Sequence, residues 1–524
     1  MKQTVRFLLY LALAACLPAC APQDAPDAFD ILIVNGTVYD GTLSPARGTN
    51  IGISGDRIVS MNAPGDAAAG LVIDASGLVV VPGFIDPHTH AGDDLADPLH
   101  NSNVNYLAQG VTTVFIGNDG RGIVDRPQQV AAMQTRGIGT NVAFFAGHGT
   151  VRKTVMGLEN RAPDEDELER MRELVTEEMR AGAIGLSTGL YYTPGSFSDT
   201  AEVIELARIA ARFGGVYDSH MRDESSYSIG LLGSVKELIE IAEAAGIPAH
   251  MAHLKALGRD VWGQSGDIVA LVEAARERGL DITADQYPWR ASGTSFSSSL
   301  MPRWVMADSR EAMFGRLANP DLKDRIREEM QQNLLRRGGA ESLLVTESDS
   351  QWRGLTLDEI AARMQVDPLQ AAVEVVREGD PSIASFNMNP SDIQAIAIQP
   401  WVMTGSDGSS GHPRKYASYP KAYRDMVLEQ SLFPMERFVH RSSGLVADSF
   451  FLCDRGYLRE GRRADIAIID LDNYLPVADF DRPTELSTGV NYLLVNGEPA
   501  LRDGELSGAL PGVVIDRQNL DCGD

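Results

Sequence analysis

The middle of the chain alternates helical runs and short apolar runs in one repeating order. Apolar residues recur at helical spacing, a glycine closes the run, and an apolar segment follows almost at once. The clearest helical runs cover residues 168–179, 203–213, 235–245 and 268–278. Glycine closes a helix as a left-handed cap, and strands that alternate with helices form parallel sheets. This order therefore predicts a parallel sheet covered by helices.

Eight segments qualify as strands of that sheet. They are residues 78–85, 111–116, 142–146, 182–187, 214–220, 247–253, 280–285 and 396–404. Eight strand–helix units predict an α/β fold, a (β/α)8 TIM-like barrel, with its chemistry at the C-terminal strand ends. The alternative is an open doubly wound sheet, which lacks its usual Gly-x-Gly-x-x-Gly opening here. An insertion at about 287–385, between strands seven and eight, is expected to contain helices and to form a lid or a substrate wall.

Both ends of the chain instead show short strands joined by tight turns. Asn35-Gly36, Gly55-Asp56 and Asn496-Gly497 each follow a strand-like run, and such turns predict hairpins. Two β-rich ends around one middle predict a small composite β-domain built from both termini. The resulting division is residues 29–77 and 455–524 for the β-domain and 78–454 for the barrel.

Residues 1–20 form a separate segment. A basic start precedes an apolar run that is too short to span a bilayer comfortably, and the run ends at Leu17-Pro18-Ala19-Cys20. This resembles a bacterial lipoprotein signal peptide, which implies that Cys20 becomes lipid-modified and that residues 21–28 serve as a tether. Ala21 after the cysteine implies anchoring in the outer membrane, facing the periplasm. The alternative is a secretory signal and a soluble periplasmic or secreted protein.

Composition narrows the class of partner. The 524 residues are 44% hydrophobic and 23% charged, which is enough for one large domain and a smaller one. A net charge of -26 argues against nucleic acid as a partner. We expect contact with a membrane only through the lipid anchor. Cys453 and Cys522 remain as candidate thiols in the mature chain, so no disulfide framework is expected.

A pair of histidines follows the first strand of the predicted barrel, in His88-Thr89-His90. Alternate residues of a strand point to the same side, so both imidazoles can face one point. Neutral imidazole nitrogens at this spacing suit a divalent metal such as zinc. Surface or hydrogen-bonded histidines are the alternative, but polar residues recur at later strand ends and favour the metal site.

The polar residues at the strand ends form one series. In chain order they are His88 and His90, Asn118-Asp119, His148, Tyr191-Tyr192, His220, His253 and Asp407. Two pairs of histidines, a bridging anion and an aspartate can hold one or two cations, which lower the pKa of water and polarise a carbonyl oxygen. His148 and His250 are better explained as core histidines.

Asp407 follows the last strand, in Gly405-Ser406-Asp407-Gly408. Alone this sequence indicates a turn. After a barrel strand, in a chain with these histidines, Asp407 is better explained as a base that takes a proton from water and gives it to the leaving amine. Lys255 and Arg414 suit the carboxylate of an acyl-amino acid, with solvated charges as the alternative.

These motifs together resemble the amidohydrolase superfamily, and within it the D-aminoacylase (N-acyl-D-amino-acid deacylase) family. The resemblance runs from about residue 29 to 512. It is carried by Pro82 to His90, Gly110 to Val114, Gly147 to Arg152, Gly185 to Tyr192, His220 to Glu224, His253 to Lys255, Gly405 to Gly408, His412 to Arg414 and Arg463 to Ile466.

The resemblance implies a role for each matching residue. By this resemblance, His220 and His253 bind a tightly held metal, and His88 and His90 bind a weaker or second metal. Asp407 is the general base. The residues that contact the substrate carboxylate are Lys255, Tyr287 and Arg414. One position departs from the family, which commonly has cysteine where this chain has Asp119. A carboxylate can bridge metals but is a harder ligand than thiolate. We expect Asp119 to bind metal, and we expect the site either to prefer zinc less strongly or to hold two metals with more equal affinity. The alternative is a site with one metal, in which Asp119 only forms a hydrogen bond to a ligand.

The leading hypothesis for function is metal-dependent hydrolysis of an N-acyl-D-amino acid, a small molecule, to a carboxylate and a D-amino acid. A second hypothesis keeps the chemistry but changes the substrate to a dipeptide, another short peptide or another amide. The third is a tethered binding protein without catalysis, which the intact histidines and Asp407 disfavour.

Overall fold

Eight parallel strands form a barrel in the computed structural model, which describes residues 28–122 and 126–520. The strands are β8 (Phe84–Asp86), β9 (Val111–Ile116), β10 (Asn141–Gly147), β11 (Gly185–Gly189), β12 (Val216–His220), β13 (Ala249–Met251), β14 (Ile282–Gln286) and β18 (Val402–Thr404). Neighbours in the chain are neighbours in the sheet. A parallel bridge from Thr89 to Gly408 joins the first strand to the last. The barrel prediction is therefore confirmed, and the doubly wound alternative is wrong.

Helices cover the outside of the barrel as the sequence predicts. The four predicted helical runs correspond to α5 (Glu165–Arg180), α6 (Thr200–Arg212), α7 (Leu231–Ala245) and α8 (Ser265–Glu277), two of which end one residue earlier than predicted. In α5, a capping box at Asp164 starts the helix, and its apolar side chains are buried against the barrel. Gly246 ends α7 in the left-handed conformation, with φ of 63°. Glycine is the residue that adopts this conformation at least cost.

The eighth strand is shorter than predicted. Residues 396–397 belong to α14 (Pro390–Ala397), and the strand begins only at Val402. Ile396 is buried in the same core as Trp401 and Val402. A short apolar run gives the same pattern whether it is the buried face of a helix or a buried strand, which explains the error.

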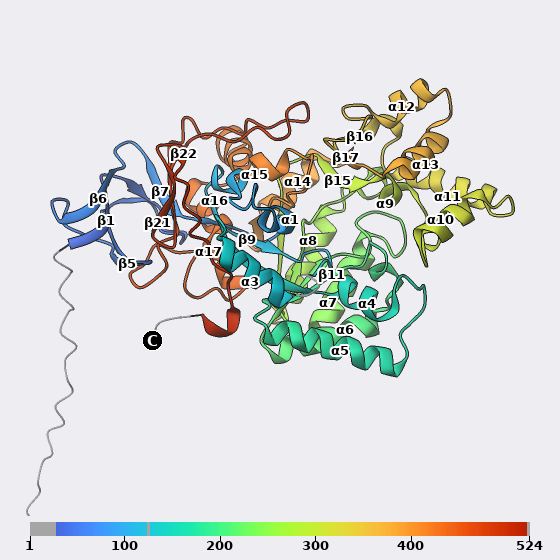
Figure 1. The fold of residues 1–524 in the computed structure, drawn as a ribbon, viewed down its shortest axis with the longest axis horizontal. Coiled ribbons are helices and arrows are strands. Elements are labelled where there is room, and N and C mark those ends of the chain that lie inside the picture. Colours follow the sequence, from blue (N-terminus) through green and yellow to red (C-terminus); the bar gives the residue numbers. More distant parts are fainter. Residues whose placement is uncertain (1–27, 123–125, 521–524) are drawn as a thin grey trace, which may run out of the picture.

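The insertion between β14 and β18 has its own sheet and its own core (upper right in Figure 1). Its antiparallel strands are β15 (Ala291–Ser295), β16 (Leu343–Val345) and β17 (Ser382–Phe386). Its helices are α9 (Phe296–Leu300), α10 (Arg310–Ala318), α11 (Lys323–Arg336), α12 (Leu357–Met364) and α13 (Pro368–Glu378). The helices were expected from the sequence, but the sheet was not.

The β-domain lies at the opposite end of the molecule, where blue and dark red strands meet (Figure 1). One sheet contains β1 (Ala28–Val34), β4 (Ile51–Ser54), β5 (Arg57–Ser60) and β6 (Ala68–Asp74). The other contains β2 (Thr37–Val38), β3 (Arg47–Gly48), β7 (Val79–Pro82), β19 (Ile466–Ile469), β20 (Val490–Val495), β21 (Glu498–Arg502) and β22 (Glu505–Leu506). Side chains of both sheets share one buried cluster. The composite β-domain is confirmed, but the first barrel strand, predicted at 78–85, is wrong in its first part. Val79–Pro82 is β7, which pairs with β2 and β19 of the β-domain, and the barrel begins only at β8.

Two of the three predicted hairpins form. Gly55-Asp56 joins the antiparallel pair β4–β5, and Asn496-Gly497 joins β20–β21. The hairpin at Asn35-Gly36 is wrong, because β1 pairs with β4 and β6 whereas β2 pairs with β3 and β7. The turn is present, with φ of 63° at Asn35, but it carries the chain from one sheet to the other.

The predicted signal peptide, the lipidation at Cys20 and the tether up to residue 27 lie outside the described residues. Among the residues that the structure does describe, no helix is both long and apolar enough to cross a bilayer. Cys453, one of the two candidate thiols, is disulfide-bonded.

A buried carboxylate connects the β-domain to the barrel. Asp465 precedes β19 and is 4% exposed. Its carboxylate accepts hydrogen bonds from Asn141 of β10 (3.1 Å), from the backbone of Asn496 (2.7 Å) and from Arg455 (2.9 Å). Because all of these partners are buried or nearly so, the β-domain and the barrel are stabilised together.

We predict that Asp465→Ala destabilises the protein by about 3–5 kcal/mol, because it leaves the buried Arg455 with one carboxylate fewer and breaks three hydrogen bonds. Glu173→Ala, which removes an exposed ion pair with Arg170 on α5, is the control and should cost about 0.5 kcal/mol or less. Urea unfolding followed by tryptophan fluorescence measures both. Equal midpoints for the two variants would contradict this role of Asp465.

Candidate metal centre and active site

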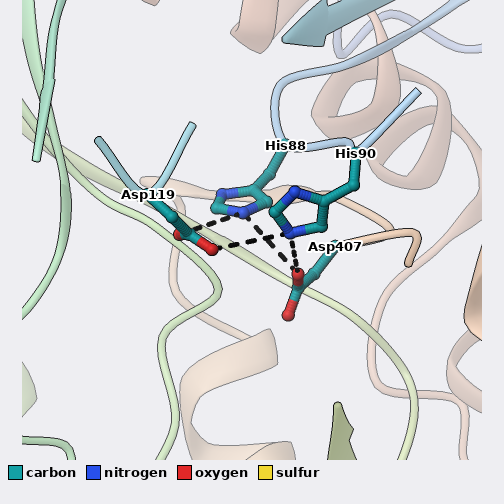
Figure 2. A group of neighbouring side chains, drawn as sticks. All are labelled: His88, His90, Asp119 and Asp407. Atoms are coloured by element: carbon teal, nitrogen blue, oxygen red, sulfur yellow. Dashed lines mark hydrogen bonds and ion pairs between the residues drawn. The ribbon is translucent and has the colours of Figure 1, made fainter. Parts of the chain in front are cut away.

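The C-terminal strand ends bring four of the predicted histidines around one carboxylate. Oδ1 of Asp119, after β9, lies 3.4 Å from a ring nitrogen of each of His88, His220 and His253. Its Oδ2 lies 3.5 Å from Nε2 of His90. Figure 2 shows His88, His90 and Asp407 turned toward Asp119 and one another. Residues far apart in sequence thus meet at the barrel mouth.

Asp407 completes the cluster from the end of β18. Its Oδ1 lies 3.2 Å from His90 and 3.6 Å from His88. Its Oδ2 forms an ion pair of 2.7 Å with Arg414. The cluster divides into two groups of donors that share Asp119, one with His88, His90 and Asp407 and the other with His220 and His253. Within each group the ligand atoms lie within 4.8 Å of one another, so each group can surround one cation.

Unpartnered buried atoms test whether these residues fit a metal. Both ring nitrogens of His88, Oδ1 of Asp119 and Nδ1 of His220 are buried without a hydrogen-bond partner. Burying such atoms unsatisfied is costly, so a group of them in one place indicates a site for a ligand. Imidazole nitrogens and carboxylate oxygens are the donors that zinc and similar divalent cations take. The residues therefore fit one or two divalent cations.

The charge states of His88, His220 and Asp119 agree with a metal site. Burial lowers the pKa of His88 to about 3, which keeps the imidazole neutral and able to bind a cation. Burial raises the pKa of Asp119, but His88 and His220 more than offset this and hold the pKa well below its usual range. Asp119 is therefore a carboxylate beside His88 and His220, and burial lowers the pKa of both imidazoles. Burial and Lys255 lower the pKa of His253, but Asp407 and Glu224 more than offset this and raise it to about 10.

Three of these residues have a backbone conformation that side chains other than glycine rarely adopt. The φ angle is 57° at Asp119, 38° at His253 and 48° at Asp407. All three follow the end of a strand directly or nearly so. Such strain is commonly concentrated at functional sites, where the surrounding fold enforces it. Here it accompanies three side chains that point into the same cluster.

The three residues predicted to contact a substrate carboxylate also come together. The guanidinium of Arg414 lies 4.9 Å from the centre of the Tyr287 ring, and the ammonium of Lys255 lies 5.8 Å from it. The Tyr287 hydroxyl and Nε of Arg414 are buried without hydrogen-bond partners. Lys255, His253 and Asp407 line one pocket with Tyr191, Tyr192, His220, Glu224, Tyr227, Leu257, Ser292, Gly293, Thr294 and Arg337.

Glu224 is a site residue to which the sequence analysis assigned no role. Its carboxylate accepts a hydrogen bond from Lys255 (2.6 Å) and lies 3.2 Å from Nδ1 of His253 and 3.7 Å from Nε2 of His220. Burial raises the pKa of Glu224, but Lys255 and the two histidines more than offset this, so Glu224 stays charged. Its position four residues after His220, in a motif already noted, was the available signal.

The two histidines expected in the core lie apart from the cluster. His148 is fully buried and hydrogen-bonded to Glu202 at 2.8 Å. His250 is hydrogen-bonded to Asp285 at 3.0 Å and to Thr283 at 2.8 Å. Asp285 also accepts a hydrogen bond from the backbone N–H of His253, so His250 helps to hold His253 in place through Asp285.

A (β/α)8 barrel with buried histidines and carboxylates at its mouth defines a metal-dependent hydrolase of the amidohydrolase class. Residues 71–278 match the model of the amidohydrolase family. The chain is 31% identical to D-aminoacylase from Alcaligenes xylosoxydans xylosoxydans, over 94% of this chain and 99% of that one. It is 30% identical to N-acyl-D-aspartate deacylase of the same organism, over 94% of this chain and 96% of that one. It is 29% identical to N-acyl-D-glutamate deacylase of the same organism, over 90% of this chain and 93% of that one. The chain belongs to the D-aminoacylase family.

Solved structures agree with this assignment. N-acyl-D-glutamate deacylase from Bordetella bronchiseptica, in complex with zinc and a phosphonate that mimics the tetrahedral intermediate, is 29% identical with a TM-score of 0.80. A D-aminoacylase structure from work on its binuclear metal centre has the same identity and TM-score. Each covers 93% of this chain and 100% of the solved chain.

We predict that His220→Asn lowers the zinc retained by the protein, whereas His148→Asn does not. Both histidines are buried, but only His220 lies beside Asp119, and His148 is paired with Glu202. Zinc per chain, measured by mass spectrometry after loading and dialysis, should fall by about one equivalent in His220→Asn only. Equal zinc content in the wild type and His220→Asn would contradict the assignment of the metal centre.

Proposed function

We propose that this chain uses one or two divalent cations, zinc in the first instance, to hydrolyse the amide bond of N-acyl-D-amino acids. The products are a carboxylate and a free D-amino acid. The observation that carries the proposal is the set of four histidines around Asp119, with Asp407 and three substrate-binding candidates beside it. The relatives' names support the D configuration, because all three act on D-amino acid derivatives.

Two groups of residues would hold the cations. His220, His253 and Asp119 would bind one, and His88 and His90, with Asp119 shared, would bind the other. When bound, a divalent cation lowers the pKa of a water molecule and polarises the amide carbonyl. Asp119 contributes an oxygen ligand at the centre of an otherwise nitrogen-rich site. Compared with a thiolate, this carboxylate favours two cation positions of more equal affinity.

Asp407 would move the proton. Burial raises the pKa of Asp407, but Arg414 and His253 more than offset this and keep it ionised, as a general base requires. Its Oδ1 faces His88 and His90, where the attacking water would lie. Oδ1 would take a proton from that water and deliver it to the departing amide nitrogen, while Arg414 orients the carboxylate through Oδ2.

Lys255, Tyr287 and Arg414 would position the substrate by its α-carboxylate. The unpartnered Tyr287 hydroxyl and Arg414 Nε are donors that such a carboxylate can satisfy. Glu224 would hold Lys255 and His253 in place through their side chains. Fixing the carboxylate beside Asp407 places the scissile bond near the base, which is the main benefit of orientation in catalysis.

We predict that zinc-loaded enzyme releases free amino acid from N-acetyl-D-amino acids and not from the L enantiomers. Asp407→Asn should lose about 10²–10⁴-fold in kcat because it removes the base. Asp503→Asn, on an exposed turn with φ of 53° that asparagine also adopts, is the matched control and should retain activity. Free amino groups can be quantified by derivatisation and chiral chromatography.

The outcomes separate the alternatives. Release from L substrates or from dipeptides alone would replace the proposed substrate. Full activity of Asp407→Asn would refute the proposed base. Tight ligand binding without turnover of any amide would favour a binding protein.

We also propose that the protein is exported and anchored in the outer membrane through a lipid on Cys20, facing the periplasm. Lys2 and Arg6, the apolar run and Leu17-Pro18-Ala19-Cys20 support this. The disulfide at Cys453 supports an oxidising compartment as well.

In a Gram-negative host, we predict that the wild-type chain incorporates labelled palmitate and fractionates with membranes. Cys20→Ser should lose the label, whereas Cys16→Ser, inside the segment to be removed, should keep it. A wild-type chain that carries no label and is released with the periplasmic fraction would contradict the anchor and favour a soluble exported protein.

A further inference from the structure

One buried arginine in the pocket has no carboxylate partner. Arg337 follows α11 of the insertion and is 2% exposed. It donates from Nε to the Tyr227 hydroxyl (2.6 Å) and from Nη2 to the Tyr191 hydroxyl (2.7 Å). Among the residues that the structure describes, no acidic side chain forms an ion pair with Arg337. A buried cation without a counter-charge is costly, so an anion that enters the pocket would be favoured there.

Other buried arginines show how unusual this is. Arg152, Arg414 and Arg455 each form an ion pair with a carboxylate. Arg441 is held by two backbone carbonyl oxygens, of Ala397 and Met403. Within the described part of the chain, Arg337 is the buried arginine whose partners are only neutral hydroxyls. This occurs in a chain with a net charge of -26, where acidic residues are plentiful.

The surroundings of Arg337 are electropositive. The guanidinium of Arg303 lies 3.9 Å from the centre of the Tyr191 ring, and it too forms no ion pair among the described residues. Two cations thus act on the same phenol ring, at the wall that the insertion adds to the pocket.

This wall adjoins the metal centre. The Tyr191 ring stacks on His220, with centroids 5.6 Å apart and an interplanar angle of 29°. Arg337 and His220 line the same pocket, together with Lys255 and Asp407. A substrate with its amide at the metal centre therefore has Arg337 within the same enclosure, on the wall of Tyr191 and Tyr227. The α-carboxylate has its own candidate partners around Tyr287, so Arg337 is available to a second group.

We propose that Arg337 binds a carboxylate on the side chain of the substrate, so that the preferred substrates are N-acyl derivatives of acidic D-amino acids. This rests on the proposed deacylase function and names its substrate class. The relatives do not decide the side chain, because identities of 31%, 30% and 29% to the general, the aspartate and the glutamate deacylase are equivalent. Arg337 is the residue that points to an acidic side chain, because a guanidinium recognises a carboxylate through paired charge-assisted hydrogen bonds.

A purely structural role is the competing explanation. Arg337 connects the insertion to loops of the barrel through two tyrosine hydroxyls, and its removal would then weaken the fold and slow all substrates alike. A comparison of acidic and neutral substrates of the same shape separates the two roles.

The test compares kcat/KM for N-acetyl-D-glutamate and N-acetyl-D-glutamine on zinc-loaded enzyme. The wild type should favour the acid by about tenfold or more, as expected for a charge-assisted contact in a buried pocket. In Arg337→Met that preference should disappear, mainly through a higher KM for the acid, and Arg337→Lys should keep part of it. Arg336→Met is the matched control, because Arg336 is hydrogen-bonded to Ser226 and Asn333 and does not line this pocket. It should keep the wild-type preference.

Two results would overturn the assignment of Arg337. One is a wild-type enzyme that hydrolyses the amide as well as the acid or better, and this readout does not depend on whether any variant folds. The other is a parallel loss for both substrates in Arg337→Met and Arg337→Lys with a lowered melting temperature. A wild-type enzyme that hydrolyses no N-acyl-D-amino acid, acidic or neutral, would instead refute the proposed function itself.

Discussion

The site depends on one buried carboxylate, that of Asp119, held among the histidines of the barrel mouth. A buried anion is stable only when positive or hydrogen-bonding groups compensate it. One oxygen of Asp119 lies 3.4 Å from three separate histidines and has no hydrogen-bond partner. The left-handed backbone at Asp119, with φ of 57°, adds strain at the same residue. A divalent cation relieves both the buried charge and the unsatisfied nitrogens, which explains why these features occur together.

The geometry around Asp119 relies on how the barrel is closed. Gly83 carries the chain directly from β7 of the β-domain into β8, and a Cβ at this position would lie 2.3 Å from the Thr112 side chain. Asp86 then accepts hydrogen bonds from the backbone of His88 (3.2 Å) and of Ser406 (3.1 Å). The first and last strands are thus joined beside the metal centre, and His88 and Asp407 are placed on either side of that joint. The β-domain therefore leads directly into the first barrel strand, although it contributes no residue to the cluster.

Features with a local physical cause could be predicted from the sequence, and features set by distant contacts could not. Helix periodicity and glycine caps predict the barrel, because each depends on neighbouring residues. The same logic places polar residues at the C-terminal strand ends, where parallel strands bring them together. The pairing of β1 and β2 could not be read from Asn35-Gly36, since turn chemistry specifies the turn and not the partner strands. The place of Arg337 in the pocket could not be predicted either, because it depends on how a long insertion packs against Tyr191 and Tyr227.

The most direct test of this account is an anomalous difference map from crystals grown with zinc. The account predicts a strong peak about 2.0–2.2 Å from Asp119 Oδ1 and from ring nitrogens of His220 and His253, with any second peak beside His88 and His90 and Asp119 shared between the two. A map with no peak at Asp119, or with zinc held by the histidines while Asp119 points away, would contradict the central place given to this carboxylate.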